Sequence, residues 1–298
     1  MGEQPNLRRG FTLVELLVAL AIIALILASI IPFILANLEA SRRIKCEDNL
    51  RTIYYALGDY QRDFLTYPRT RFDPNRNDWT CYTGTDEMHP FADSSTVAVN
   101  DVTASLWLLV RIGYLPDTAT FICPSSDRVR DPMTNAAGGR ATLLERGNFR
   151  SVRNLAYSIL SPFNPSPAFV WNDTLPSDSA LLADMNPGMA GTRDEVTKPL
   201  AHDQPMTQAW ANANNHAKAG QNVLYSGGSV QFESTAFCGY GSQPAGERNA
   251  QPVTGDNIFT AYRATPGGKP LIDGPGDYGK SFAPTWNYDS YLLPSDDE

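Results

Sequence analysis

The chain has 298 residues and a formal charge of −8 at pH 7, and its sequence pI is near 4.9. This length is enough for one membrane element and one soluble domain with its own core. Binding to phosphate backbones requires clustered Lys and Arg, so the acidic balance argues against a nucleic-acid partner. The basic cluster "SRRIK" at residues 41–45 is typical of a patch that flanks a membrane segment.

The stretch "RRGFTLVELLVALAIIALILASIIPF" occupies residues 8–33, and no charged residue appears from Leu16 to Ile31. A helix over residues 11–36 would be roughly 39 Å long, which exceeds a hydrocarbon core of about 30 Å. Glu15 lies near the start of this run, where a lone carboxylate costs about 2.5–3.5 kcal/mol on insertion scales. A charge of that cost is usually retained for a partner.

The alternative interpretation of the same run is a secretory signal or a simple signal anchor. Two arginines, an apolar core and small residues such as Ala36 fit that pattern. The run is long for a cleaved signal, and a plain anchor gives Glu15 no role. This alternative implies a membrane-anchored, non-polymerising binding domain or enzyme, or a protein released by cleavage near Ala36.

The letters "RRG" followed by "FTLVE" resemble the processing site of type IV prepilins and of the related type II secretion pseudopilins. The resemblance implies that a prepilin peptidase cleaves after Gly10 and methylates the new amino terminus at Phe11. Glu15 matches the glutamate of the family's fifth mature position, and Pro32 matches its helix-kinking proline. Cleavage creates a cationic amine at Phe11, which is expected to pair with Glu15 of an adjacent subunit, since each charge alone is costly in lipid.

This resemblance implies a leader over residues 1–10, a transmembrane and filament-core helix over 11–38, and a soluble pilin-like domain over 39–298. The implied partners are other pilins or pseudopilins, the prepilin peptidase and an inner-membrane assembly platform. The chain would cross the inner membrane once, with its soluble domain in the periplasm, and would enter a filament after assembly, with the cell surface as one destination. A type II secretion pseudopilus and a type IV pilus remain equally open.

Periodicity predicts two helices in the soluble part. An amphipathic helix is expected over 39–65, because five apolar residues recur at spacings of three and four. They are Leu50, Ile53, Leu57, Tyr60 and Phe64. Pro68 follows this helix, and a second apolar helix is expected over 104–116, with Gly113 as its stop.

Four short stretches are typical of strands, near 119–123, 155–160, 168–171 and 179–184. A hairpin is expected over 220–234, with a turn at Ser226, Gly227 and Gly228 where glycine takes positive φ without strain. The expected fold class is therefore α+β. It is pilin-like, with a long amino-terminal helix packed on an antiparallel sheet with long loops.

The hairpin region also resembles a carboxy-terminal signature of a pilin-like family abundant in planctomycete-type bacteria: His, nine residues, then Asp-Gly. His216 stands at the histidine position, and Ser226-Gly227 stands at the Asp-Gly position. Serine in place of aspartate removes the carboxylate that could bind a metal there. For His216 a structural hydrogen bond at the start of the hairpin is favoured over a metal or pH-switch role.

The four cysteines, Cys46, Cys81, Cys123 and Cys238, form no CxxC pair, so metal-site spacing is absent. In an exported domain one or two disulfides are expected, and four cysteines allow three full pairings. Cys123 is expected to be half of a disulfide or a buried thiol rather than a nucleophile.

Four acidic residues in the soluble part are candidates for a turn or for a ligand. Asp184 ends an expected strand, and an Asx-type turn with Asn186, Pro187 and Gly188 is favoured there over a catalytic role for Asp184. Asp256, Asp273 and Asp277 lie among glycines and are weak calcium candidates, because they lack EF-hand spacing. The chain contains no GxSxG or HExxH motif. No catalytic residue is predicted, and apart from calcium no cofactor is expected.

Overall fold

The computed structural model describes residues 12–76, 78–189, 196, 203–243, 253–264, 270–273 and 290–296. The chain divides into two compact units, Met1–Ser41 and Arg42–Glu298. The first helix, α1 (Leu13–Phe64), has 52 residues and begins in the first unit. Its backbone is helical on both sides of Pro32, and the side chain of Pro32 lies outside the described residues.

The part of α1 that belongs to the second unit presents an apolar stripe to the core. Leu50, Ile53, Leu57 and Tyr60 are buried, as the spacing of three and four predicts. Phe64 was expected to continue the stripe, but its side chain is 49% exposed, so that part of the prediction is wrong. The helix ends at Phe64 and the next residue, Leu65, has a φ of 63°, so the chain leaves the core surface at this point.

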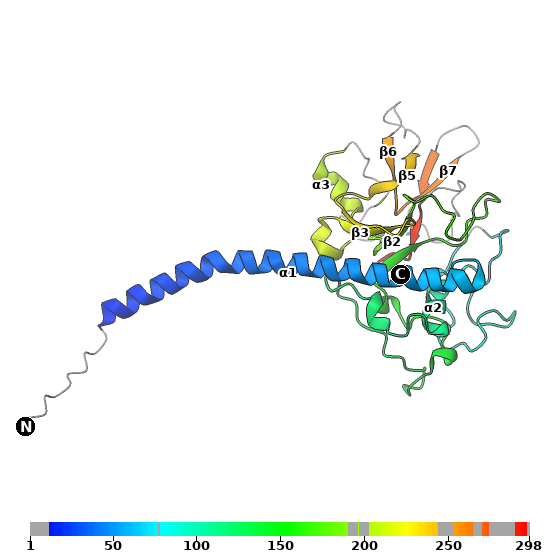
Figure 1. Cartoon of the computed structure of the whole chain (residues 1–298), viewed down its shortest axis with the longest axis horizontal. Helices are drawn as coiled ribbons and strands as arrows, with labels where there is room; N and C mark the ends of the chain where they lie inside the picture. Colours follow the sequence, from blue (N-terminus) through cyan, green and yellow to red (C-terminus); the bar gives the residue numbers. More distant parts are fainter. Residues whose placement is uncertain are drawn as a thin grey trace, which may run out of the picture. The chain divides into compact units, whose positions relative to one another are not determined.

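The second helix, α2 (Val102–Ile112), is buried along nearly its whole length. The Asp101 side chain accepts a hydrogen bond from the backbone N–H of Ala104 and caps the first turn. Gly113 closes the helix with a φ of 93°, a left-handed conformation that glycine adopts without a Cβ penalty. The helix thus starts two residues before the predicted one and ends at the predicted glycine. In Figure 1 the second half of α1 runs between α2 and the sheet.

The main sheet is antiparallel and has five strands in the order β4-β3-β2-β1-β9. These strands are β1 (Tyr157–Leu160), β2 (Ala180–Asp184), β3 (Gln221–Tyr225), β4 (Val230–Glu233) and β9 (Leu292–Leu293). Leu182 and Leu224 face the same core as α1, while Ala183 and Val223 face a second apolar cluster with Phe259. β1 was expected to be half-buried and is instead buried on both faces, because each face of the sheet is covered.

Short elements and long loops make up most of the rest of the described chain. Two further hairpins pair β5 (Phe237–Gln243) with β6 (Val253–Asn257) and β7 (Ala261–Ala264) with β8 (Pro270–Asp273). One-turn helices are η1 (Thr118–Phe121), η2 (Leu143–Glu145), η3 (Val152–Asn154), α3 (Pro205–Gln208), η4 (Ala209–Ala211) and η5 (Asn215–Lys218). A long amino-terminal helix followed by an antiparallel sheet confirms the α+β prediction and is consistent with a pilin-like fold.

Two predicted strands are wrong. The stretch near 119–123 begins as the helical turn η1, because the Asp117 carboxylate accepts the N–H of Ala119 and caps a turn there. The stretch 168–171 forms no strand, since the Trp171 carbonyl accepts the N–H of Tyr67, just after α1. The apolar composition correctly predicted that Phe121 and Trp171 are buried. It did not predict which groups form hydrogen bonds with their backbones.

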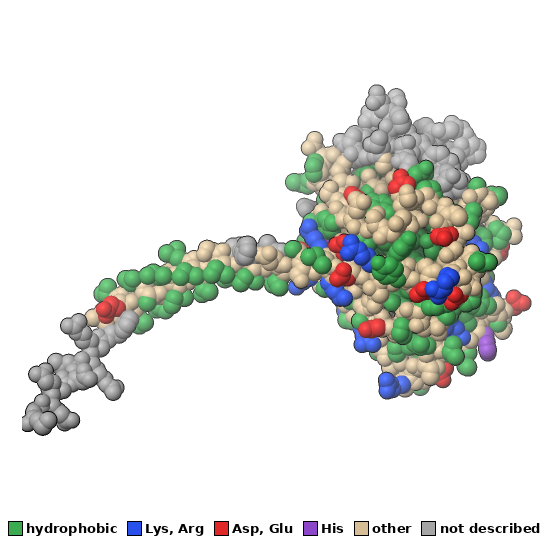
Figure 2. Space-filling view, viewed as in Figure 1, with side chains coloured by type: hydrophobic (Ala, Val, Ile, Leu, Met, Phe, Trp, Pro, Cys, Tyr) green, Lys and Arg blue, Asp and Glu red, His purple; other side chains and the backbone are tan. Residues whose placement is uncertain are grey.

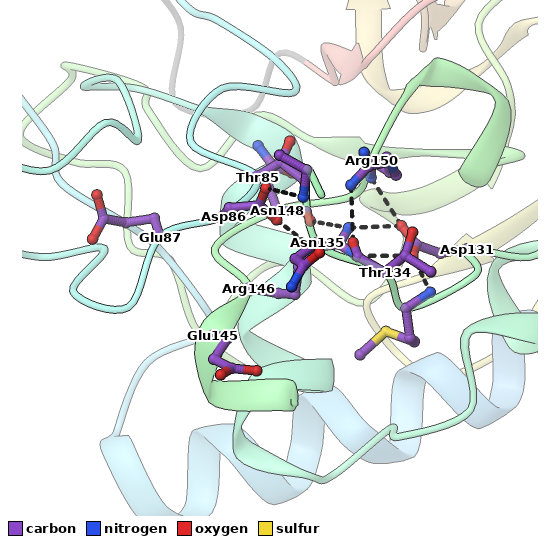
Figure 3. A network of polar contacts seen from close by, with 12 residues as sticks. Thr85, Asp86, Glu87, Asp131, Thr134, Asn135, Glu145, Arg146, Asn148 and Arg150 are labelled. Atoms are coloured by element: carbon purple, nitrogen blue, oxygen red, sulfur yellow. Dashed lines mark hydrogen bonds and ion pairs between the residues drawn. The ribbon is translucent and has the colours of Figure 1, made fainter. Parts of the chain in front are cut away.

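A buried ion pair between Asp131 and Arg146 joins two segments of the long loops (Figure 3). The guanidinium of Arg146 binds Asp131 through both carboxylate oxygens, at 3.2 and 2.9 Å, and both side chains are fully buried. Arg146 also donates to the carbonyls of Thr134 and Asn148. Its guanidinium lies 5.0 Å from the ring centroid of Trp107 on α2. These contacts hold residues 131–148 in place where regular secondary structure is sparse.

Candidate functional site

The amino-terminal part of α1 is apolar and uncovered. Leu13–Ile31 is 19 residues long with a mean hydropathy of 2.9, and none of its side chains is buried. Figure 2 shows hydrophobic side chains along this stretch of helix. By length and composition the segment is able to cross a membrane, although a signal sequence has the same properties. A large exposed apolar surface of this kind is typical of a membrane or protein interaction site.

Glu15 closes a capping box at the start of α1. Its Oε2 accepts hydrogen bonds from the backbone N–H and the hydroxyl of Thr12, both at 2.8 Å. The Thr12 hydroxyl in turn accepts the N–H of Glu15 at 3.2 Å. This reciprocal arrangement satisfies backbone donors that a helix start leaves without partners. This role was not among those expected for Glu15, although Thr12 and Glu15 have the required spacing. Gly10 and Phe11 lie outside the described residues.

A second constellation is buried inside the globular unit. Cys46 on α1 and Cys123, just after η1, form a disulfide. Asp184 at the end of β2 and His216 in η5 lie beside it, and both are buried. One ligating atom from each of these four residues lies within 4.8 Å of the others. The His216 Nε2 is 3.6 Å from the Cys123 Sγ and 3.2 Å from the Asp184 Oδ2.

The expected Asx turn is present at Asn186, whose side-chain oxygen accepts the N–H of Gly188 at 3.0 Å, but the Asp184 side chain takes no part in it. The Asp184 carboxylate points into the core and accepts hydrogen bonds from Asn215 at 3.1 Å and from the N–H and amide of Asn222 at 2.7 and 3.1 Å. Burial and then the Asp184 charge raise the pKa of neighbouring Tyr157 well above its ordinary value.

The backbone at His216 is unusual. His216, Ala217 and Lys218 have φ values of 57°, 54° and 61°, so three consecutive non-glycine residues are left-handed. Each such residue costs roughly 1–2 kcal/mol, and the conformation persists only where the surroundings impose it. The imidazole contacts Asp184 and the Asn222 amide, and Phe232 packs edge-on to it with ring centroids 5.7 Å apart.

Ser226 and Gly227 lie in the turn between β3 and β4, at the opposite end of β3 from His216. The structure therefore does not bring the two ends of this motif together. The N–H groups of Ser226 and Gly227 donate to the carbonyls of Ser179 and Ser177, which docks the turn beside β2. A Cβ at Gly227 would lie 3.0 Å from the Ser177 carbonyl oxygen, which explains the glycine at this position.

The remaining candidates are two thiols and three acidic residues. Cys81 and Cys238 are partly buried thiols. The Asp256 carboxylate is buried and accepts the N–H of Ser290 at 2.9 Å. Asp273 ends β8 with a side chain outside the described residues, and Asp277 also lies outside them.

One family model matches the chain. It is the prokaryotic N-terminal methylation motif, and it covers residues 5–31. No curated protein and no solved structure matches the chain. The match contains Gly10, Phe11 and Glu15 and overlaps the uncovered apolar segment of α1. The chain therefore carries a prepilin-type methylation motif at the start of an apolar helix, an arrangement consistent with membrane anchoring.

Proposed function

We propose that this protein is a structural subunit of a type II secretion pseudopilus or of a type IV pilus-like filament. Prepilin peptidase cleaves it after Gly10 and methylates Phe11, and the apolar part of α1 then packs against the same helix of neighbouring subunits. The observation that supports this most strongly is the methylation motif at residues 5–31, in register with an apolar segment that its own chain leaves uncovered.

The apolar segment Leu13–Ile31 is more stable in an apolar environment than in water, and two such environments follow one another in this proposal. Large side chains from Leu13 to Ile31 are 44–74% exposed, and each is worth about 1.5–3 kcal/mol when removed from water. A bilayer supplies that environment before assembly, and a bundle of identical helices supplies it in a filament. The soluble domain then lies outside the inner membrane, in the periplasm, and an inner-membrane assembly platform moves the subunit from one environment to the other.

Glu15 fixes the axial position of one subunit on the next. Both hydrogen bonds from Thr12 end on Oε2, and we assign Oε1 to the methylated amine of an adjacent subunit. The capping box orients the carboxylate, and the amine neutralises it. A charge pair in an apolar bundle is worth far more than one in water, and either partner alone is strongly unfavourable there.

The first expected result concerns the mature amino terminus. Mass spectrometry of the protein from its native membranes should give a chain that begins at N-methylated Phe11. Gly10→Val should leave the leader attached, because the cleaved bond follows Gly10, whereas Gly2→Val in the same leader should be processed normally. A mature chain that starts at Met1 or beyond residue 35 would contradict the proposal and favour an anchored or released domain.

The second expected result separates charge from capping. Glu15→Gln retains the acceptor oxygen of the capping box, which Gln also supports, but it removes the charge. We expect normal cleavage and insertion but at least about a tenfold loss of filaments in the sheared fraction, since one lost pairing of 1.4 kcal/mol already gives that factor. Glu47→Gln removes a carboxylate paired with Arg51 on the same helix and should assemble normally. Normal assembly of Glu15→Gln would refute the pairing.

A further inference from the structure

Two cysteine sulfurs, a carboxylate and an imidazole converge in the core from parts of the chain that are far apart in sequence. We propose that, when the Cys46–Cys123 disulfide is reduced, Cys46, Cys123, Asp184 and His216 bind one Zn²⁺ ion. In the oxidised structure the sulfurs are bonded to one another, so the disulfide and the metal site are alternatives. This inference does not depend on the filament role.

The distances fit tetrahedral zinc. With Zn–S near 2.3 Å and Zn–N near 2.0–2.1 Å, a sulfur and a nitrogen ligand lie about 3.5 Å apart, and a nitrogen and an oxygen ligand about 3.3 Å apart. The observed separations are 3.6 Å for Cys123 Sγ to His216 Nε2 and 3.2 Å for His216 Nε2 to Asp184 Oδ2. Cleavage of the disulfide releases the two sulfurs to move apart to the separation of about 3.8 Å that two thiolate ligands adopt.

The surroundings hold the oxygen and nitrogen ligands in position. Asn215 donates to one oxygen of Asp184, and Asn222 donates to the other through its N–H and its side-chain amide. Such outer contacts orient ligands in metal sites and typically change affinity 10–100-fold. The imidazole of His216 lies beside Asp184 and Cys123, and the backbone from His216 to Lys218 is left-handed. The proposed ligand role of His216 gives a reason for this strained backbone conformation.

An aromatic and a cationic side chain lie beside the proposed site. Phe232 contacts the imidazole edge-on, and the guanidinium of Arg43 lies 4.0 Å from the centroid of the same ring. Both side chains are only partly buried.

The chemistry balances with a dithiol as the reductant. The disulfide takes up two electrons and two protons from the dithiol, which becomes a disulfide itself, and Cys46 and Cys123 become thiols. Binding of Zn²⁺ then releases those two protons as the thiols become thiolate ligands. With two thiolates and the Asp184 carboxylate, the ligand set carries three negative charges against two on the ion. Soft thiolate ligands and an imidazole favour Zn²⁺ over Ca²⁺ or Mg²⁺.

The consequence is that α1 keeps a link to Cys123 in either redox state. Under oxidising conditions the link is covalent, and under reducing conditions it is the metal. Because Cys46 lies on the helix that continues into the apolar segment, this link joins the assembly helix to the core of the globular unit.

The test uses the full-length protein in detergent, with Co²⁺ as a spectroscopic substitute for Zn²⁺. After reduction with a water-soluble phosphine, which takes oxygen from water as it converts the disulfide to two thiols, Co²⁺ should bind at one equivalent per chain. It should show thiolate-to-cobalt charge-transfer absorption and the intense visible bands of tetrahedral Co²⁺, and Zn²⁺ should displace it. The oxidised protein should show neither signal.

The variants identify the ligands. His216→Gln should weaken binding at least about tenfold, and its matched control, His89→Gln on an exposed loop, should bind as the wild type does. Cys81→Ser with Cys238→Ser should keep the charge-transfer band. Circular dichroism of each reduced sample reports folding. The proposal is refuted if reduced wild type gives no thiolate band, whether it is folded or unfolded, or if the band disappears with Cys81 and Cys238 rather than with His216.

Discussion

Replacement of Cys46 and Cys123 by alanine is expected to lower the free energy of unfolding of the oxidised protein by about 4 kcal/mol. The disulfide closes a loop with a sequence separation of 77 residues. In the chain-entropy description such a crosslink lowers the conformational entropy of the unfolded chain, which destabilises the unfolded state by about 4.5 kcal/mol. Loss of a native disulfide typically lowers the free energy of unfolding by about 2–5 kcal/mol. Both cysteines are fully buried, so the small cavity left by two alanines adds to the loss.

Denaturant titration of the full chain in detergent, followed by fluorescence of the buried Trp107 and Trp171, measures this effect. EDTA in all samples removes any contribution from metal. The matched control is Cys81→Ala with Cys238→Ala, which removes two thiols that are not in the crosslink and should cost far less. Equal midpoints for wild type and the Cys46/Cys123 double variant would show that the crosslink does not constrain the unfolded chain.

Asp131→Ala is expected to destabilise the globular unit by about 3–5 kcal/mol, because it leaves the fully buried guanidinium of Arg146 without its counter-ion. The Asp131 carboxylate also accepts the N–H groups of Met133 and Arg150, both at 2.8 Å, so two backbone donors lose their partner as well. Asp131, Met133 and Arg150 lie in loops, so no regular strand pairing would replace the hydrogen bonds that are lost (Figure 3).

Two further variants test whether the destabilisation by Asp131→Ala comes from the unpaired charge of Arg146. Asp59→Ala removes an exposed carboxylate that binds Arg62 on α1, and such pairs contribute about 0–1 kcal/mol. Asp131→Leu combined with Arg146→Met removes both buried charges and should recover part of the stability, since no unpaired charge remains. A Tm of Asp131→Ala equal to that of Asp59→Ala would mean that water reaches Arg146 and that the site is not dry.

Local patterns in the sequence were sufficient for several elements. The stripe from Leu50 to Tyr60, the buried α2 with its Gly113 stop, β2 and the β3–β4 hairpin all follow from spacing and turn chemistry, because each pattern reports which face of its own element is buried. The strands predicted near 119–123 and at 168–171 are absent from the described structure. There the residues are apolar, but a side-chain cap at Asp117 and a backbone contact with Tyr67 decided the conformation.

The buried cluster shows what sequence spacing does not report. Cys46, Cys123, Asp184 and His216 come from α1, the segment after η1, β2 and η5, so no CxxC or HExxH pattern connects them. Asp184 precedes an Asn-Pro-Gly turn, and this local context did not indicate that its carboxylate lies in the core. The left-handed backbone of His216 to Lys218 has no signature in the letters "HAK", since glycine and asparagine are the residues usually found in that conformation.

The methylation motif, the membrane-length helix and the α+β class could be predicted from the sequence, because each depends on the order and periodicity of neighbouring residues. The cysteine pairing, the reason why Arg146 is tolerated in the core, and the carboxylate and imidazole beside the disulfide became evident from the folded chain alone. Those features depend on distances between elements, and such distances are fixed when the sheet closes against α1 rather than by any one segment.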